Sequence, residues 1–307
     1  MKNILITGGT GSIGSHLVPM LLAKGFQITI LTRNTSLNSS LPQLKYSPWN
    51  PDNLAYDKKP FEECDYIIHL AGANIAEKKW TEKRKVILCQ SRIRSSETII
   101  KALAETNNHT YAIISASGIN YYANKGNNQL LTEEDFPGEG FLSKLCADWE
   151  NKISEAKAFS KRVVIFRTGV VLDKKSGAYP KLIAPLKFRI AAVIGGGKQA
   201  VSWIHIHDLC RAYIHAIEND SMEGSFNACA PEITTNEKLM VSAAHKKFGN
   251  AFLKFHVPSF LLKMALGELA EEAILADISA SPQKLRNTGF RFEYVSLEKA
   301  IENLEEK

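Results

Sequence analysis

Two short motifs contain residues that could bind a phosphate group and transfer a proton. Residues 7–14 read TGGTGSIG, a turn that has glycines at positions 8, 9, 11 and 14. Because glycine has no Cβ atom, such a turn lets backbone N–H groups approach a pyrophosphate at the start of a helix. Residues 117–125 read SGINYYANK and contain the spacing Tyr121-x-x-x-Lys125. A tyrosine and a lysine at this spacing could form an acid/base couple, in which the lysine lowers the pKa of the phenol.

The Tyr121–Lys125 pair is predicted to lie in a loop, because asparagine and glycine residues surround the lysine. A working couple needs both side chains on one face of a helix. The next helical segment, FLSKLCADWENKI, has no tyrosine, and its apolar stripe predicts that Cys146 is a buried thiol. We therefore interpret the spacing as accidental. Ser117, Tyr121 and Tyr122 remain the candidate catalytic residues.

Alternating strand and helix patterns must position both motifs. Apolar runs predict strands at 3–7, 27–31, 65–70, 111–116 and 162–167, and helical spacing predicts helices at 15–23, 78–106 and 140–158. This order predicts an α/β fold, a Rossmann-type doubly wound parallel sheet with a smaller C-terminal substrate lobe. Ligands of such sheets lie beyond the carboxyl ends of the strands. Both motifs fall at such ends, so the Ser117 hydroxyl is expected to open into the ligand crevice.

The end of the second predicted strand indicates which dinucleotide the turn binds. A cofactor without a 2′-phosphate usually meets an Asp or Glu about 20 residues after the glycines. Thr32 and Arg33 occupy that place here. A guanidinium can bind the 2′-phosphate through paired hydrogen bonds, whereas a carboxylate would repel it. We therefore predict NADP(H) in preference to NAD(H). The alternative is that Arg33 is a solvated loop residue.

Composition and charge argue against several other classes. The chain has 307 residues and a net charge of +6, but its 38 basic and 32 acidic residues are interleaved. The basic cluster at 78–85 is interpreted as a helix face, so no nucleic-acid partner is expected. No apolar stretch approaches the ~20 residues that span a bilayer, so no membrane partner is expected. Five cysteines without C-x-x-C spacing indicate a reducing compartment, and we predict a cytoplasmic protein.

Other polar residues have side chains of types that can bind a metal or act in catalysis. His205 and His207 in WIHIHD lack a clear third ligand, and Asp208 suits a helix cap, so no metal site is expected. The carboxylates at 133–135 and at Asp148 and Glu150 are expected to be solvated or to cap helices.

Longer motifs resemble a known family. TGGTGSIG, DYIIHLAG, SASGINYY and WIHIHD are similar to motifs of the extended short-chain dehydrogenase/reductase superfamily. LAGANIAEKKWTEKRK, GFLSKLCADWE, RTGVVL and the C-terminal VPSF…GE…SPQKL…TGFRF resemble its atypical, YfcH-like epimerase-family branch. That branch is NAD-dependent epimerase/dehydratase-like and has a C-terminal domain of unknown function. The resemblance covers nearly the whole chain.

The resemblance implies an NADP(H) site and gives Ser117 the place of the catalytic serine or threonine. It also implies a standard Tyr-x-x-x-Lys couple on the following helix, where GFLSKLCADWENKI has no tyrosine, so this couple is absent. The expected cofactor-binding residues are Gly8, Gly11, Ser12, Ile13, Gly14, Thr32, Arg33, Leu70, Ala71, Gly72, Arg92 and Val170. The dinucleotide-binding domain is expected at 1–230, with substrate-lobe elements from about 171. The C-terminal lobe is expected at 231–307 and includes a family-specific tail at 257–303.

Two functions remain open at this point. One is an NADP(H)-dependent oxidoreductase or epimerase that acts on a small polar molecule such as a nucleotide sugar, without the standard couple. The other is a non-catalytic NADP(H)-binding sensor. The sequence leaves the oligomeric state undetermined.

Overall fold

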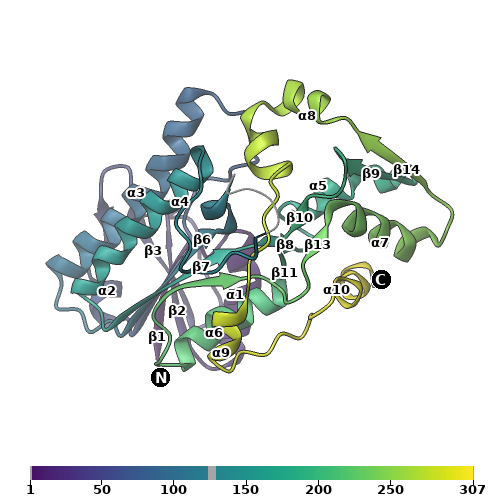
Figure 1. Cartoon of the computed structure of the whole chain (residues 1–307). Coiled ribbons are helices and arrows are strands. Elements are labelled where there is room, and N and C mark those ends of the chain that lie inside the picture. Colours follow the sequence, from purple (N-terminus) through teal and green to yellow (C-terminus); the bar gives the residue numbers. More distant parts are fainter. Residues whose placement is uncertain (1, 124–128, 307) are drawn as a thin grey trace.

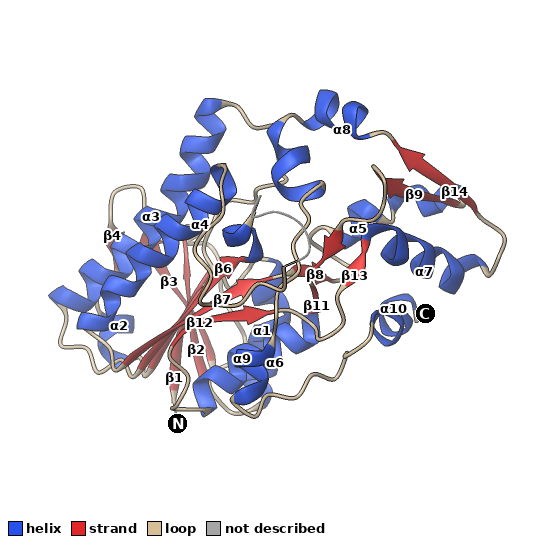
Figure 2. Ribbon diagram, in the orientation of Figure 1, coloured by secondary structure: helices blue, strands red, loops and turns tan. Residues whose placement is uncertain are grey.

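The computed structural model describes residues 2–123 and 129–306 and is built around one large sheet. Figures 1 and 2 show this sheet with helices on both faces. Its eight strands follow the order β12-β7-β6-β5-β1-β2-β3-β4, and all neighbours are parallel except β3 and β4. The strands are β1 (Asn3–Thr7), β2 (Gln27–Thr32), β3 (Leu44–Asn50), β4 (Ala55–Tyr56), β5 (Tyr66–His69), β6 (Ala112–Gly118), β7 (Arg162–Thr168) and β12 (Gly224–Ala228). The predicted Rossmann-type doubly wound fold is confirmed.

The described residues also form ten helices and four short helical turns. The helices are α1 (Ser12–Ala23), α2 (Lys59–Glu63), α3 (Glu82–Glu105), α4 (Phe141–Ser154), α5 (Tyr179–Leu182), α6 (Ile206–Glu218), α7 (Asn236–Phe248), α8 (Ser259–Leu266), α9 (Gln283–Asn287) and α10 (Leu297–Glu305). The turns are η1 (Ile119–Tyr122), η2 (Glu155–Ala158), η3 (Ala184–Phe188) and η4 (Ala270–Ile274). None of the helices in the described part is long and apolar enough to cross a bilayer.

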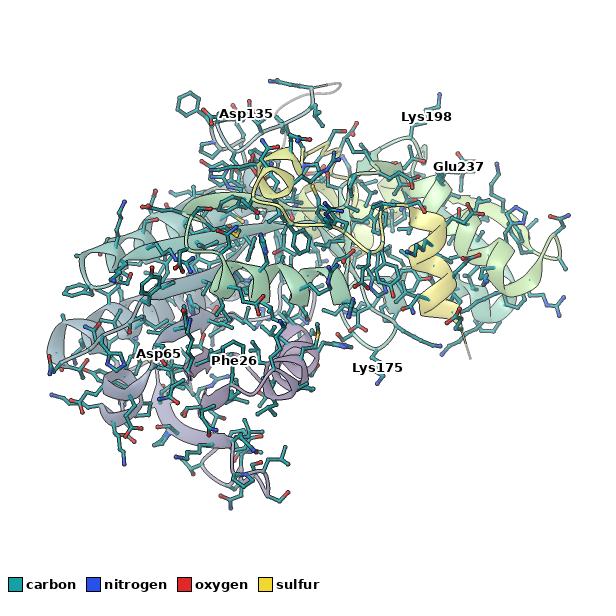
Figure 3. The ribbon with its side chains drawn as sticks, turned by 90° about the horizontal axis from the view of Figure 1, so that it is seen from below. Phe26, Asp65, Asp135, Lys175, Lys198 and Glu237 are labelled. Atoms are coloured by element: carbon teal, nitrogen blue, oxygen red, sulfur yellow. The ribbon has the colours of Figure 1, made fainter. Side chains whose placement is uncertain are left out.

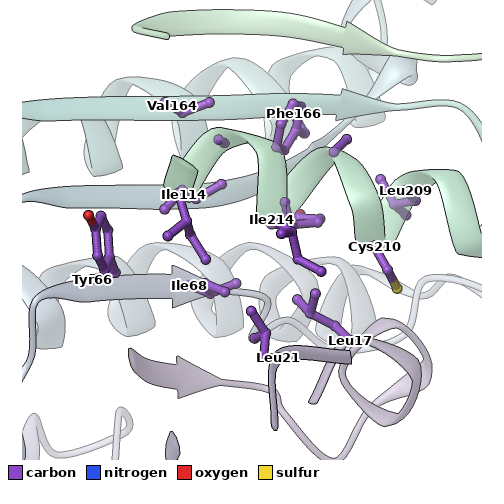
Figure 4. Close-up of a cluster of buried hydrophobic side chains, with 14 of the residues drawn as sticks. Leu17, Leu21, Tyr66, Ile68, Ile114, Val164, Phe166, Leu209, Cys210 and Ile214 are labelled. Atoms are coloured by element: carbon purple, nitrogen blue, oxygen red, sulfur yellow. The ribbon is translucent and has the colours of Figure 1, made fainter. Parts of the chain in front are cut away.

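Side-chain alternation in the strands creates the two halves of the core. Ile4 and Ile6 of β1 belong to the cluster that α1 and α6 cover, which Figure 4 shows in close-up. Leu5 points to the opposite face, into the cluster formed with α2, α3 and α4. Burying each such side chain contributes about 1.5–3 kcal/mol, so a sheet that is apolar on both faces requires both helix layers.

Two differences from the sequence prediction have physical causes. β3 was not predicted because its sequence, LKYSPWN, mixes polar residues and a proline with apolar ones. The helix predicted from residue 78 begins instead at Glu82, because the Thr81 side chain caps it by accepting a hydrogen bond from the Arg84 backbone N–H. Part of the basic cluster therefore precedes the helix.

A smaller lobe contains three two-stranded sheets. Its strands are β8 (Val170–Leu172), β9 (Ile190–Ile194), β10 (Ala200–Val201), β11 (Trp203–His205), β13 (Thr234–Thr235) and β14 (Leu253–Val257). Its core joins α7 and α10 around buried residues such as Leu239 and Ile301. The C-terminal segment also returns to the main sheet, because Leu285 of α9 and Phe290 enter the cluster under α6. The division predicted at residue 230 stays a prediction.

Candidate functional site

The carboxyl ends of five neighbouring strands line one edge of the sheet. Thr7, the last residue of β1, lies opposite Leu31 of β2 and His69 of β5. Further along the sheet, Ser117 of β6 lies opposite Arg167 of β7. The glycine turn after Thr7 therefore lies between the end of β2 and the segment that follows β5. The predicted cofactor residues lie along this edge, either at the end of a strand, just after it or at the start of the next element. Arg92 is the exception, because it comes from α3.

Close packing explains two of the glycines in the turn. Gly8 has φ +69°, and a Cβ atom there would lie 2.8 Å from the Leu70 carbonyl group and 2.9 Å from the Ala71 nitrogen. A Cβ atom on Gly14 would lie 2.3 Å from the Gly9 carbonyl oxygen. Side chains at either position would push the turn away from β5 or from the start of α1.

The start of α1 is open to a ligand. Gly11 occupies the N-cap position, where no side chain accepts a hydrogen bond from the first turn. Ser12 is exposed and Ile13 is half-buried against the core. The first N–H groups of α1 therefore face outward at the positive end of the helix, which suits a pyrophosphate.

A buried histidine network lies under the turn, and sequence reasoning missed it. The Thr7 hydroxyl oxygen accepts hydrogen bonds from the backbone N–H groups of Leu70 and Ala71, both at 3.2 Å. His69 Nδ1 lies 2.7 Å from the Thr7 hydroxyl oxygen, and Nε2 lies 3.2 Å from the Ser96 hydroxyl oxygen and accepts a hydrogen bond from the Trp149 indole N–H at 3.4 Å. Burial lowers the pKa of His69 to about 3, so the ring is neutral near pH 7. The network fixes the distance between β1 and the loop after β5. The only sequence signal was a histidine in an apolar strand.

The end of β2 presents Arg33 to solvent. The Thr32 hydroxyl accepts a hydrogen bond from the Asn34 backbone N–H at 3.0 Å, which holds the local turn. Arg33 is exposed and makes no hydrogen bond or ion pair with the described residues. Its guanidinium is therefore available to an anion beside the glycine turn, as the NADP(H) prediction requires.

Arg92 holds the loop after β5 from the other side. One of its nitrogens donates to the carbonyl oxygens of Ala73, at 3.2 Å, and Leu88, at 3.0 Å. Its guanidinium carbon lies 5.1 Å from the centre of the Trp149 ring, and a Cβ atom on Gly72 would lie 3.2 Å from it. Burial lowers the pKa of Arg92. Leu70 and Ala71 are half-buried and Gly72 is exposed, so this loop borders the crevice.

Ser117 belongs to a buried ionic network. Ser117 is a residue of β6, and it is only 6% exposed. The hydroxyl donates to Glu150 Oε1 at 2.6 Å, and Glu150 pairs with Arg167 at 2.8 Å. The expectation that this hydroxyl opens into the crevice is wrong, because it is buried and donates its hydrogen bond to a carboxylate on α4. The expectation of a solvated or capping Glu150 is also wrong, because Arg167 and Ser117 supply the partners that its burial requires.

Tyr122 points away from the crevice. Its side chain is fully buried, donates to Asn227 Oδ1 at 2.9 Å and accepts from Arg167 at 2.7 Å. Burial raises its pKa. Its candidacy as a catalytic residue is therefore corrected: it is a core side chain. Tyr121 is half-buried, and the Arg167 guanidinium carbon lies 3.4 Å from the centre of its ring, so Tyr121 remains at the border of the site.

Helix α4 contains no tyrosine among its residues Phe141–Ser154. Lys125 lies outside the described residues, and Lys144 of α4 is exposed. Four residues before Lys144 stands Gly140, with φ +103°, where a Cβ atom would be 3.1 Å from the Glu272 carboxylate. Glu272 accepts hydrogen bonds from the backbone N–H groups of the first two residues of α4. Cys146 is buried as predicted, and burial raises its pKa to about 11.

Comparison with known proteins identifies the family. The model of the NAD dependent epimerase/dehydratase family matches residues 4–229. The chain belongs to this family. A second model, for a domain of unknown function (DUF1731), matches residues 257–304. The resemblance inferred from the sequence motifs is confirmed.

Several relatives of this epimerase-family chain span its full length. It is 32% identical to epimerase family protein ML0860 of Mycobacterium leprae, over 97% of this chain and 94% of that protein. The structure of human epimerase family protein SDR39U1 (isoform 2) with NADPH has a TM-score of 0.86 and 26% identity, and 98% of each chain is covered. The nucleoside-diphosphate sugar epimerase from Corynebacterium glutamicum has a TM-score of 0.76 and 27% identity, over 98% of this chain and 57% of that one.

The remaining polar candidates of the epimerase-family chain have structural partners. Asp208 does not cap α6, because His205 occupies that position. Asp208 instead accepts from the backbone N–H groups of Glu293 and Tyr294. Glu133 accepts from the Asn227 backbone N–H at 2.6 Å. Within residues 2–123 and 129–306, no group of three or more His, Cys, Asp or Glu side chains could hold a metal ion.

Removing the Ser117 hydroxyl is expected to destabilise the protein. Hydrogen bonds to charged groups contribute about 1.5–3 kcal/mol, so Ser117→Ala should lower the free energy of unfolding in urea by this amount. Ser225→Ala is the matched control, because that hydroxyl lies 3.2 Å from Glu150 Oε2 and is less buried. Ser225→Ala should therefore lower the free energy of unfolding by less than Ser117→Ala does. Equal losses in the two variants would contradict a special role for the 2.6 Å contact between Ser117 and Glu150.

Proposed function

We propose that the protein is an NADP(H)-dependent oxidoreductase or epimerase that acts on a small polar molecule. The observation that carries the proposal is the alignment of the glycine turn with Arg33, which extends from the neighbouring strand into solvent. The turn fits a dinucleotide, since Gly8 and Gly14 leave no room for side chains and α1 begins with open N–H groups. The NADPH named with the human relative SDR39U1 supports the choice of cofactor.

The proposed cofactor would run along the sheet edge in the order of the strands, which TGGTGSIG and Arg33 support. The 2′-phosphate end would meet Arg33 and Thr32 after β2, and the pyrophosphate would meet the turn at Gly8–Gly14. The nicotinamide end would reach the region of Ser117, Tyr121 and Val170. When bound, the dinucleotide would supply the hydride donor or acceptor. The half-buried Tyr121 would border the substrate carbon, and Ser117 would lie beneath it, with its hydroxyl donating a hydrogen bond to Glu150.

Nucleotide sugars are the first substrate class to test. The Corynebacterium glutamicum relative is named a nucleoside-diphosphate sugar epimerase, and the family model describes epimerases and dehydratases. The enzyme would work without the standard couple, since α4 carries no tyrosine. General acid/base catalysis typically supplies about 10²–10⁴ in rate, so slow turnover is expected.

A non-catalytic NADP(H) sensor is the second candidate. It is favoured by the engagement of the candidate acid/base groups in the interior: Ser117 donates to Glu150, and Tyr122 bonds to Asn227 and Arg167. Incubation of the NADPH complex with pools of nucleotide sugars distinguishes the enzyme from the sensor. Substrate-dependent loss of NADPH absorbance supports the enzyme. Tight binding with no turnover by any pool supports the sensor.

Replacing Arg33 should remove the cofactor preference. In fluorescence titrations, the unmutated protein is expected to bind NADPH more tightly than NADH. Arg33→Asp should weaken NADPH binding by roughly 10–100-fold, since a charge-assisted hydrogen bond contributes about 1.5–3 kcal/mol, and should leave NADH binding much less affected. Lys45→Asp changes the net charge equally, but lies near the amino end of β3, at the opposite edge of the sheet, and should have little effect. Equal affinities for both cofactors in the unmutated protein would refute the preference.

A further inference from the structure

A short stretch of the C-terminal domain of unknown function, residues 267–276, connects the lobe with the helices of the main sheet. The chain reaches it from the lobe through β14 and α8, and returns to the lobe at Asp277, which accepts a hydrogen bond from the Ala200 backbone N–H at 2.8 Å. Between these points it packs against α3 and α4. In Figure 1 it is the yellow-green turn between α8 and α4. Figure 3 marks the lobe with Lys198 and Glu237 and the opposite side of the molecule with Phe26 and Asp65. We call residues 267–276 the roof segment.

The roof segment touches both chain segments that follow β5 and β6. The Glu272 backbone carbonyl accepts a hydrogen bond from Asn120 Nδ2 at 2.8 Å, directly before Tyr121 in the turn after β6. On its other side, Leu269 belongs to a hydrophobic cluster against which Ala73 packs, in the loop after β5. β5 and β6 are neighbours in the sheet, and both segments border the crevice. The roof segment therefore bridges the end of the crevice at which Tyr121 lies.

A carboxylate fastens the roof segment to the first turn of α4. The Glu272 side chain accepts hydrogen bonds from the backbone N–H groups of Phe141 and Leu142, at 2.9 and 2.6 Å. A helix between two parallel strands runs opposite to them, so α4 begins at the carboxyl edge of the sheet, where the crevice is. The helix dipole strengthens this contact. A second link is the ion pair between Glu268 and Lys85 of α3.

The chain around the roof segment has few buried contacts. Residues 245–277 are all described, and in this stretch only Leu269 and Ala270 are buried. Helix α8, which leads into the roof segment, buries none of its residues. Gly267, the first residue of the roof segment, has φ +62°, and glycine gives the chain conformational freedom at this point. Segments with few buried contacts open at a lower free energy than global unfolding requires. The roof segment can therefore open while the sheet stays folded.

We propose that the roof segment is a gate that opens to admit the substrate to the nicotinamide end of the crevice, and that Glu272 holds it closed. Opening breaks the contacts of Glu272 with α4 and turns the segment about Gly267. Ile278 stays in place, because its N–H donates to the Ala200 carbonyl oxygen at 3.3 Å. Closing excludes water from the reacting groups, as lids of other enzymes do. The identity of what passes the gate rests on the proposed function, whereas the movement does not.

Hydrogen–deuterium exchange tests the movement without cofactor or substrate. In the unmutated protein, the amides of the roof segment should exchange while those of β6 stay protected. Glu272→Ala should speed their exchange by about tenfold or more, because it removes two hydrogen bonds to a charged group. Glu271→Ala is the matched control and should have little effect, because that carboxylate pairs with Lys263 of α8. Glu268→Gln leaves α4 capped and should speed the same amides if Glu272→Ala does not fold. Equal effects of the Glu271 and Glu272 variants, or exchange of the roof segment only together with β6, would overturn the proposal.

Quenching of NADPH fluorescence by acrylamide tests whether the roof segment covers the cofactor. Acrylamide reaches the nicotinamide of bound NADPH when the gate is open, so Glu272→Ala should raise the quenching constant by roughly twofold or more, and Glu271→Ala should not. Faster exchange without increased quenching would show that the movement does not expose the nicotinamide, and would overturn the gate. A protein that binds no NADPH would refute the proposed function instead, and the exchange experiment alone would then decide whether the segment opens.

Discussion

Glu150→Gln is expected to lower the free energy of unfolding by about 3–5 kcal/mol, because it leaves the Arg167 guanidinium buried without a counterion. The two side chains are only 8% and 6% exposed, so water does not replace the lost partner. Burial by itself would lower the pKa of Arg167, but the hydrogen bonds and charge of Glu150 outweigh it and raise the pKa. A guanidinium is not deprotonated in proteins even without its counterion, so Arg167 stays charged in the variant. Urea unfolding followed by circular dichroism measures the loss.

A double-mutant cycle separates the ion pair from its surroundings. Glu150→Gln combined with Arg167→Met should be at least about 2 kcal/mol more stable than the sum of the single changes predicts, since the double variant buries no unpaired charge. Glu218→Gln is the control, because it removes the partner of Lys24 from a pair whose side chains are about half exposed. It should leave the unfolding midpoint essentially unchanged. Additive losses in the cycle would contradict the coupling.

Gly8→Ala is expected to weaken NADPH binding by roughly 10–100-fold. The new Cβ atom would meet the Leu70 carbonyl group at 2.8 Å and the Ala71 nitrogen at 2.9 Å, and these are backbone atoms that cannot rotate away. Overpacking of this kind costs about 1–3 kcal/mol, and the turn can relieve it only by moving off the pyrophosphate position. Fluorescence titration with NADPH measures the loss, and a thermal melt shows whether the variant is folded.

Gly25→Ala isolates the effect of backbone conformation. Gly25 also has a positive φ, +84°, but a Cβ atom there would meet nothing within 4 Å. This variant should lose some stability, because an alanine is strained at such a φ, and it should bind NADPH normally. If both alanines reduced cofactor affinity equally, the close approach of β5 to the turn would not be what requires glycine at position 8.

The sequence alone was sufficient for the fold and for the place of the glycine turn at the carboxyl edge of the sheet. Local signals carry these features: apolar runs such as Asn3–Thr7, the glycine spacing that follows, and the missing acid at Thr32-Arg33. Each depends on a few adjacent residues, and parallel strands bring their carboxyl ends together whatever the loops contain. The absence of a tyrosine from α4 could be read in the same way.

The sequence could not reveal what each polar side chain contacts. Ser117 and Glu150 are 33 residues apart, and Glu272 caps a helix that begins 131 residues earlier in the chain. A carboxylate looks the same in a sequence whether water or a buried guanidinium surrounds it. Its environment depends on which helix packs over which strand. The sequence thus determined that a glycine turn follows the first strand of a parallel sheet. The tertiary structure decided which hydroxyls and charges are left exposed there, because burial and partners come from contacts between distant segments.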